Sequence, residues 1–242
     1  MEGDVAGSSR GNGADSSARF RNSEELQDWM NEEGDGSADM SASDVDMLKR
    51  AWRNEKAAPE VLPFQTLLVE RVREQILLME DNLVAFSGEI SEELMLSLYR
   101  MDLDRTLFLL RAYLRTRLNK IEKFALHVLK AQELWDRLSE QEQDYAQRFT
   151  DSLHKHFQQT VLGKLPYGYQ SIMKQATSSE EDDMIPEPNL DTFVFCRSKR
   201  AIGAFQLDEK GDETVDLMAD DLYILRYRPI KDLLDNDRIE LV

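Results

Sequence analysis

Apolar residues recur every three or four positions from about residue 43 to residue 165, a period that predicts amphipathic helices. Ser43 is expected to begin the first helix, because a serine followed by an acid three residues later is typical of a helix N-terminus, and Pro59 closes the segment. The second helix is predicted over about 64–84, with one apolar stripe as its buried face: Leu68, Val72, Ile76, Met79 and Leu83.

The third predicted helix is long, because residues 91–130 contain neither glycine nor proline. Such a length suggests a spine against which other helices, or other chains, pack. The fourth helix is expected to start at Ser139, where Glu142 completes a second capping-box pattern, and to end at Gly163. Residues 43–165 are therefore predicted to form an all-helical domain. The apolar positions of the third helix are Leu94, Leu98, Met101, Phe108, Ala112, Leu118, Ile121, Ala125, Val128 and Leu129.

The pattern changes to a period of two near the C-terminus, and that period predicts strands. A polar, acidic and proline-containing linker, residues 166–188, precedes the change. The fold class expected for the chain is therefore α+β, with the helical domain followed by a small β-rich domain, residues 189–242. Strands are predicted at 192–196, 204–207, 214–217, 222–227 and 239–242, with a turn at 210–212 and a helical turn at 230–234.

The first 42 residues have the composition of a disordered acidic tail. Residues 1–40 carry ten acids against three arginines and hold six of the eleven glycines of the chain. Leu26, Trp29 and Met30 interrupt this tail at helical spacing, so a helical turn would place them on one face. They are either a chance apolar trio or a short docking motif that folds on a partner.

Composition excludes several classes of function. The formal charge of −17 argues against a dedicated nucleic-acid-binding protein, because an acidic surface repels phosphates. No apolar run approaches the ~18 residues that a membrane-spanning helix needs. The one cysteine, Cys196, cannot form an internal disulfide, and it fits a reducing compartment, nuclear or cytosolic.

Candidate catalytic chemistry is sparse. His154 and His156 are two positions apart on a predicted helix, so they point in different directions and cannot share a metal ion. Cys196 lies in the middle of a predicted strand, where a buried small side chain is expected rather than a nucleophile. Counting acids does not exclude the paired carboxylates of a hydrolase, but most acids lie in the tail, the linker and exposed helix faces.

The clearest charge feature lies on the long helix, where residues 100–130 carry eight basic side chains against three acids. The favoured interpretation is pairing of these cations with acidic neighbours between helices or subunits, because arginine suits interface ion pairs. The alternative is a nucleic-acid-binding module that uses this basic face, and it predicts DNA affinity that falls steeply with salt.

Several segments, in the right order along the chain, resemble the Sld-five-type subunit of the GINS complex. AWRNEKAAPEVL at 51–62 resembles the family's AWxNEKxAPELL, and YLRTRLNKIEKF at 113–124 resembles YLRxRLxKIEKF. PNLDTFVF at 188–195 resembles PxLDxYVF, and the segments at 225–233 and 239–242 resemble the family's C-terminal close. The resemblance covers residues 45–242, and the tail lies outside it.

The resemblance implies a non-catalytic scaffold subunit of a four-subunit complex of paralogous chains, each with a helical and a β-rich domain. That complex joins the MCM motor ring and the Cdc-forty-five protein in the replicative helicase, so the expected location is the nucleus. No cofactor or metal, no membrane, and only weak or indirect DNA contact are expected. The tail is expected to reach a replisome adaptor or polymerase. Candidate subunit-interface residues are Trp52, Asn54, Glu55, Lys56, Pro59, Arg115, Arg117, Lys120, Lys123, Phe193, Phe195 and Tyr227.

Overall fold

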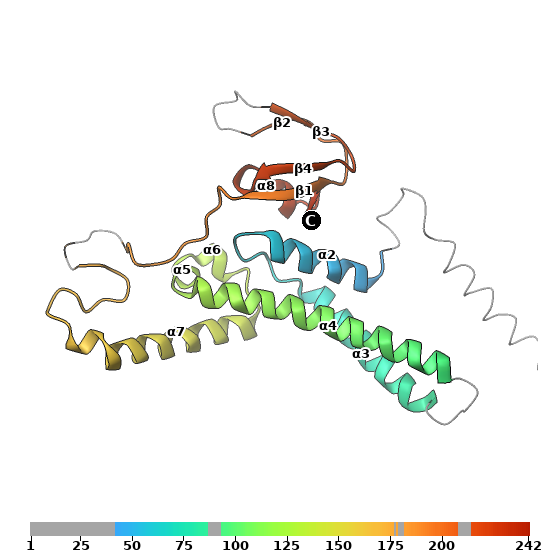
Figure 1. Ribbon diagram of the computed structural model, residues 1–242, viewed down its shortest axis with the longest axis horizontal. Coiled ribbons are helices and arrows are strands. Elements are labelled where there is room, and N and C mark those ends of the chain that lie inside the picture. The colour runs from blue at the N-terminus through green and yellow to red at the C-terminus, as the bar shows by residue number, and fades with distance from the viewer. Residues whose placement is uncertain (1–41, 87–92, 177, 179–181, 208–213) are drawn as a thin grey trace, which may run out of the picture. The chain divides into compact units, whose positions relative to one another are not determined.

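The structure, a computed structural model, describes residues 42–86, 93–176, 178, 182–207 and 214–242. A helical region precedes a small region of strands, which also contains one helix (Figure 1), so the predicted α+β class is confirmed. The tail trio Leu26, Trp29 and Met30 and the predicted turn at 210–212 lie outside the described residues. The helices are α2 (Asp44–Ala57), α3 (Thr66–Phe86), α4 (Glu93–Lys123), α5 (Ala125–Lys130), α6 (Gln132–Trp135), α7 (Glu140–Thr160) and α8 (Tyr227–Asp235), with a 3₁₀ turn, η2 (Leu162–Lys164).

The first helices form as their sequence signals predict. The hydroxyl of Ser43 accepts a hydrogen bond from the backbone N–H of Asp46 and so caps α2. The predicted stripe of α3 packs against α2 and the middle of α4, with Leu68, Val72 and Ile76 buried. Tyr113 of α4 is almost fully buried in the same core.

The long helix is shorter than predicted, because it ends at Lys123 instead of continuing to residue 130. Phe124 leaves the helical conformation, with φ −116° and ψ 21°, and a new short helix, α5, starts at Ala125. The break changes the direction of the chain and lets Phe124 and Val128 enter a second core with Ala146 of α7. The absence of glycine and proline therefore did not keep the helix continuous, since burial of Phe124 favours the bend.

Helix α7 begins with the predicted capping box. Ser139 accepts from the N–H of Glu142, and the Glu142 carboxylate accepts from the N–H of Ser139. The short helix α6, which the sequence pattern did not predict, occupies the connection between α5 and α7.

The strands make two separate antiparallel groups. β1 (Phe193–Ser198) lies between β4 (Leu222–Arg226) and β5 (Ile239–Leu241), while β2 (Gly203–Gln206) pairs with β3 (Thr214–Leu217). Side chains of β1 alternate between exposed and buried positions, so Val194 and Cys196 enter the core and Phe193 and Phe195 face outward. The core of this domain also contains Tyr227, Ile230 and Leu233 of α8.

The connection between α2 and α3 contributes to all three cores. Ala58 and Leu62 pack into the core of the β-rich domain, and Val61 packs into the core around α5 and α7. Phe64 packs against the core of α2, α3 and α4. We call residues 58–64 the hub segment, because the helical and β-rich domains meet on it.

Candidate subunit-interaction surfaces

Arg117 of α4 is the centre of a buried polar cluster beneath the hub segment. Its side chain is fully buried and makes five hydrogen bonds, which matches the five N–H groups of a guanidinium. Nε and Nη2 donate to the two oxygens of Glu142 at 2.7 and 3.0 Å, and Nη1 donates to Glu55 Oε2 at 3.0 Å. The backbone oxygens of Leu62 and Arg137 accept the remaining two bonds.

The electrostatics of the cluster favour a charged arginine. Burial alone would lower the pKa of the Arg117 guanidinium, but the hydrogen bond to Glu142 and the charge of Glu55 outweigh burial and raise that pKa above its usual range. The ring of Phe64 also faces the guanidinium, whose carbon lies 5.2 Å from the ring centre. Arg117 therefore stays charged and links α2, α4, α7 and the hub segment through its hydrogen bonds.

Lys120, one turn later on α4, holds the hub segment from the same side. Its ammonium donates to Glu55 Oε1 at 2.9 Å, to the backbone oxygen of Glu55, and to that of Glu60 at 2.7 Å. Burial lowers the pKa of Lys120, and the nearby charge of Glu55 only partly opposes this effect.

Glu60 of the hub segment connects the two domains. Its carboxylate accepts a hydrogen bond from the Tyr227 hydroxyl at 3.0 Å and pairs with Lys231 at 3.0 Å, both on α8. On the helical side it pairs with Arg137 at 3.2 Å. A second connection runs from α2 to the C-terminal strand, because the side-chain oxygen of Asn54 accepts from a backbone N–H of β5 at 2.8 Å.

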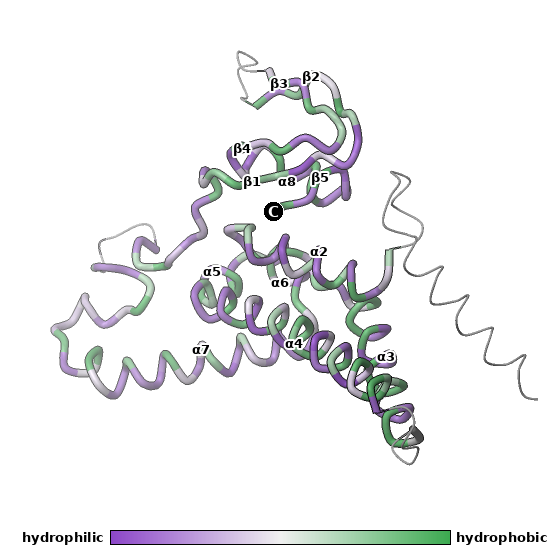
Figure 2. Tube along the Cα trace, turned by 45° about the vertical axis from the view of Figure 1, so that its right-hand side comes forward, coloured by the Kyte–Doolittle hydropathy of each residue, from purple (hydrophilic) through white to green (hydrophobic). Residues whose placement is uncertain are grey.

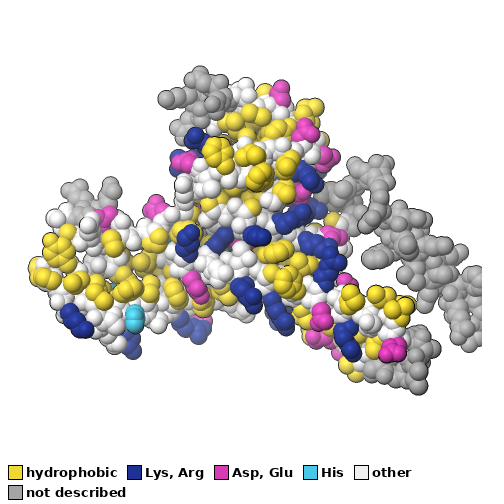
Figure 3. Space-filling view, in the orientation of Figure 1, with side chains coloured by type: hydrophobic (Ala, Val, Ile, Leu, Met, Phe, Trp, Pro, Cys, Tyr) yellow, Lys and Arg dark blue, Asp and Glu magenta, His cyan; other side chains and the backbone are white. Residues whose placement is uncertain are grey.

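The outer face of the three-stranded sheet carries four exposed apolar side chains beside two exposed arginines, Arg197 and Arg226. Phe195 is paired in register with Ile224 across β1 and β4, and Phe193 and Leu222 lie on the same face. These four side chains are 51 to 62% exposed. We call them the sheet patch, and Figure 3 shows hydrophobic side chains gathered over the strand region. Exposed apolar side chains gathered on one face and flanked by charged ones are typical of a site of protein contact.

Hydrophobic residues are frequent toward the ends of α3 and α4 that flank residues 87–92 (Figure 2), and several of them are exposed. Leu94, Leu98 and Met101 of α4 follow one another at spacings of four and three, as in the seam of packed helices, and each is more than half exposed. Leu77 and Leu78 of α3 are also more than half exposed. The apolar positions predicted at this end of the long helix thus face outward. We call Leu94, Leu98 and Met101 the helix-end patch.

The candidate interface residues divide into two groups. Arg117, Lys120, Glu55, Asn54 and Tyr227 make the internal contacts described above, and all except the partly exposed Lys120 and Asn54 are buried within the chain. The others lie at least partly on the surface: Trp52, Lys56, Pro59, Arg115, Lys123, Phe193 and Phe195.

Sequence reasoning did not single out Glu60 or Arg137, and it noted Glu142 only as the acid of a capping box, although all three make the buried polar contacts described above. Charged residues in a helical pattern are normally assigned to solvent, and no local signal marks a carboxylate that meets an arginine 25 positions away. Leu222 and Ile224 could have been found, because alternation along a strand whose opposite face is buried leaves them on the outer face.

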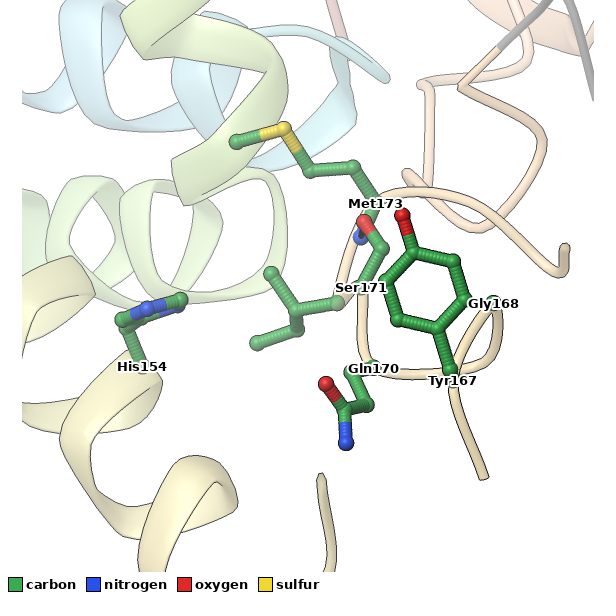
Figure 4. Close-up of a pocket in the computed structure, with 7 residues that line it drawn as sticks. His154, Tyr167, Gly168, Gln170, Ser171 and Met173 are labelled. Carbon is green, nitrogen blue, oxygen red and sulfur yellow. Dashed lines mark hydrogen bonds between the residues drawn. The ribbon is translucent and has the colours of Figure 1, made fainter. Parts of the chain in front are cut away.

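A surface cavity of about 390 Å³ lies between α7 and the segment that follows η2 (Figure 4). His154 of α7 and Tyr167, Gln170 and Met173 are among its lining residues, all exposed. It presents no buried charged group, so we assign it no ligand. Cys196 is buried in its strand as predicted, and burial raises the pKa of its thiol to about 11.

Two further features bear on the kind of site the chain offers. Among the described residues, no group of three or more His, Cys, Asp or Glu side chains is arranged to hold a metal ion. None of the described helices combines the length and the apolar character needed to cross a lipid bilayer.

Comparison with known proteins agrees with this architecture. Residues 88–161 match the family described as "GINS complex protein helical bundle domain", and residues 188–242 match "DNA replication complex GINS protein SLD5 C-terminus". The chain is thus a GINS-type subunit in which a helical domain precedes a small strand-containing domain.

Relatives of known name extend the match over most of the chain. The "DNA replication complex GINS protein SLD5" of Arabidopsis thaliana is 52% identical over 218 residues, which are 88% of this chain and 99% of that protein. The protein of the same name from Dictyostelium discoideum is 30% identical over 203 residues, 82% of this chain and 91% of that protein. The human protein of the same name is 29% identical over 228 residues, which are 89% of this chain and 98% of that protein. The chain belongs to the SLD5 family of DNA replication complex GINS proteins, and the resemblance found in its sequence is confirmed.

Proposed function

We propose that this chain is a non-catalytic scaffold subunit of a GINS complex, which it forms with three paralogous subunits. The proposal rests chiefly on the two apolar surfaces, because a chain that stays alone in water does not leave large aliphatic and aromatic side chains exposed in groups. Membership in the SLD5 family supports the same conclusion.

The sheet patch is the more rigidly held of the two proposed subunit contacts. Its backbone is fixed by the pairing of β1 with β4, and its opposite face is packed on the domain core. Such a rigid apolar surface loses little conformational entropy on binding, so most of its burial contributes to affinity. We therefore propose that Phe193 and Phe195 contact another subunit, as the sequence predicted.

The helix-end patch is proposed to pack against a helix of a sister subunit. The spacing of Leu94, Leu98 and Met101 fits packing of one helix along another. Obligate interfaces between subunits are mostly apolar and large, and these two patches have the required chemistry.

We further propose that the assembled complex works in the nucleus with the MCM ring and the Cdc-forty-five protein, as the family resemblance implies. Within this proposal the buried polar clusters have no catalytic role. They keep the hub segment and the β-rich domain in one arrangement, so that the patches are presented in a fixed geometry.

Co-expression with the three sister subunits of the same organism tests the proposal. We expect a soluble complex with the mass of one copy of each chain by light scattering. A well-behaved monomer that does not co-purify with the sister subunits would overturn the proposal.

A further inference from the structure

The basic face of the long helix is divided between internal and external contacts. Arg117 and Lys120 form ion pairs with buried carboxylates, and Lys130 pairs with Asp182. Arg111 and Arg115, by contrast, are exposed, and neither forms an ion pair with any residue that the structure describes. These cations remain available to a partner.

Helix α2 adds two more cations next to them. Arg53 and Lys56 are exposed, one turn apart, and form no ion pair within the described part of the chain. Helices α2 and α4 are packed side by side, and Figure 3 shows Lys and Arg side chains gathered over them. We call Arg53, Lys56, Arg111 and Arg115 the basic band.

Two aromatic side chains join the halves of this band. The rings of Trp52 on α2 and Phe108 on α4 meet edge to face with centres 6.5 Å apart, and Phe108 is more than half exposed. The ammonium of Lys56 lies 5.6 Å from the Trp52 ring centre. Arg111 and Arg115 follow Phe108 by one and two turns of α4. The surface therefore combines cations with an apolar anchor point.

Toward the N-terminal ends of both helices the basic surface becomes mixed, because acids lie there beside Lys49 of α2 and Arg105 of α4. Asp104 is exposed one turn before Phe108, and the exposed face of α2 carries Asp46, which pairs with Lys49. From Phe108 to Arg115 the axis of α4 advances only about 10 Å. A nucleic-acid strand, with a phosphate at every nucleotide, would extend from the band over these acids and the rest of an acidic protein. A short segment with a few local charges meets no such repulsion.

We propose that the basic band binds an acidic, amphipathic helical segment of a partner protein that is not one of the sister subunits. Two or three turns of such a helix place carboxylates opposite the four cations and an apolar side chain on Trp52 and Phe108. Small, charged interfaces of this kind are typical of reversible partners, whereas obligate subunits bury apolar surfaces such as the two patches. The inference rests on the proposed function only in that the chain works within a larger assembly.

Selection of peptide binders tests this inference, because it requires only the chemistry of the partner and not its identity. A displayed library of random 16-residue peptides is selected on the full chain, within its complex where the chain needs one, and the enriched peptides are measured by fluorescence anisotropy. The band variant is Arg53→Glu, Lys56→Glu, Arg111→Glu and Arg115→Glu. The control variant has the same change of charge at exposed cations elsewhere: Arg73→Glu, Lys155→Glu, Lys164→Glu and Arg238→Glu.

We expect enriched peptides that are acidic and carry apolar residues at helical spacing. Their affinity should fall at least tenfold for the band variant and less than threefold for the control variant. Phe108→Ala should weaken binding severalfold, and affinity should fall with rising salt. A band variant with four glutamines, checked by circular dichroism, separates loss of binding from loss of folding.

Several results would overturn the inference. It fails if the enriched peptides are not acidic, if they bind the band variant as well as the wild-type chain, or if both charge variants lose affinity equally. It also fails if a 20-nucleotide single strand of thymidine binds the band more tightly than the peptides, because the surface would then be a nucleic-acid site. Light scattering of the band variant with its sister subunits is expected to give the wild-type mass. A failure to assemble would make the band a subunit contact instead.

Discussion

The hydroxyl of Tyr227 donates a hydrogen bond to the carboxylate of Glu60, 167 residues earlier in the chain, and both side chains are buried. This contact joins the first residue of α8 to the hub segment between α2 and α3. Burial, followed by the nearby charge of Glu60, raises the pKa of the Tyr227 phenol, so the hydroxyl stays protonated and remains a donor at neutral pH. The β-rich domain is therefore attached by a polar contact with a specific geometry as well as by apolar packing.

The first prediction concerns this contact. Tyr227→Phe removes one hydrogen bond from a buried carboxylate and should lower the free energy of unfolding by about 1–2 kcal/mol. Tyr167→Phe is a suitable control, because Tyr167 is 93% exposed, and it should change stability by less than about 0.5 kcal/mol. Urea unfolding measures both variants, and equal stability of Tyr227→Phe and the wild type would contradict the assigned role.

A double-mutant cycle refines the same prediction. Glu60→Gln should destabilise the chain more than Tyr227→Phe, because Glu60 also faces Lys231 and Arg137. The two changes together should cost less than the sum of the single effects, since they act on one contact. Strictly additive effects would show that Glu60 and Tyr227 are not coupled.

The second prediction concerns Arg117. Arg117→Met leaves the carboxylates of Glu55 and Glu142 buried without their shared cation, and should lower the free energy of unfolding by roughly 3–5 kcal/mol. Arg115→Met, two positions earlier and exposed, should cost less than about 0.5 kcal/mol. Chemical unfolding followed by circular dichroism distinguishes the two, and similar effects of both variants would contradict the account of the buried cluster.

The third prediction concerns the start of α7. Glu142 serves both the capping box and Arg117, so loss of the cap should disturb more than the helix end. Ser139→Ala should cost about 1 kcal/mol of stability, whereas Ser152→Ala on the exposed middle of α7 should be neutral or slightly stabilising. Thermal unfolding of the two variants is the measurement, and a Ser139→Ala variant as stable as Ser152→Ala would show that the cap contributes nothing.

The fourth prediction is a dependence of stability on alkaline pH. Burial raises the pKa of Tyr113 from its ordinary value of 10.0 to about 12. A pKa raised by folding gives a stabilising contribution that is complete below pH 10 and is lost as the pH rises to 12, because the unfolded chain ionises first. The contribution of this one phenol is at most about 3 kcal/mol.

Tyr113→Phe tests the sign of that effect. The variant lacks the ionisable group, so its stability should fall less steeply than that of the wild type between pH 10 and 12, while both lose the contributions of Cys196 and Tyr227 alike. Urea midpoints at pH 9, 10 and 11 give the comparison. Parallel pH profiles of the two proteins would mean that burial does not perturb Tyr113.

Periodicity predicted the elements well where burial alone determines them. The stripe of α3 and the alternation of β1 each have a single apolar face on one core, so the residue pattern specifies their orientation. The break at Phe124 was not predictable in this way, because no residue there disfavours a helix. The bend is stabilised only by the burial of Phe124 and Val128 in the second core. Tertiary packing overrides local propensity at that point.

The contacts of the candidate site were harder to predict than the fold. A conspicuous basic helix indicated ion pairs, but it did not show that Arg117 and Lys120 face inward while Arg111 and Arg115 face outward. Position on the helix decides this, together with carboxylates from α2 and α7 that only the fold brings near. The apolar residues of the helix-end patch were visible in the sequence, but periodicity does not reveal whether this chain or another covers them.

The central claim is that the sheet patch is buried against a sister subunit, and one measurement tests it most directly. The chain carrying Phe195→Asp and Ile224→Asp is co-expressed with the three sister subunits and sized by light scattering, beside a control that carries Tyr167→Asp. The outer face of the sheet contributes nothing to the domain core, so the account predicts a folded chain that no longer joins the complex, while the control assembles normally. A complex of full mass with both variants would contradict the claim.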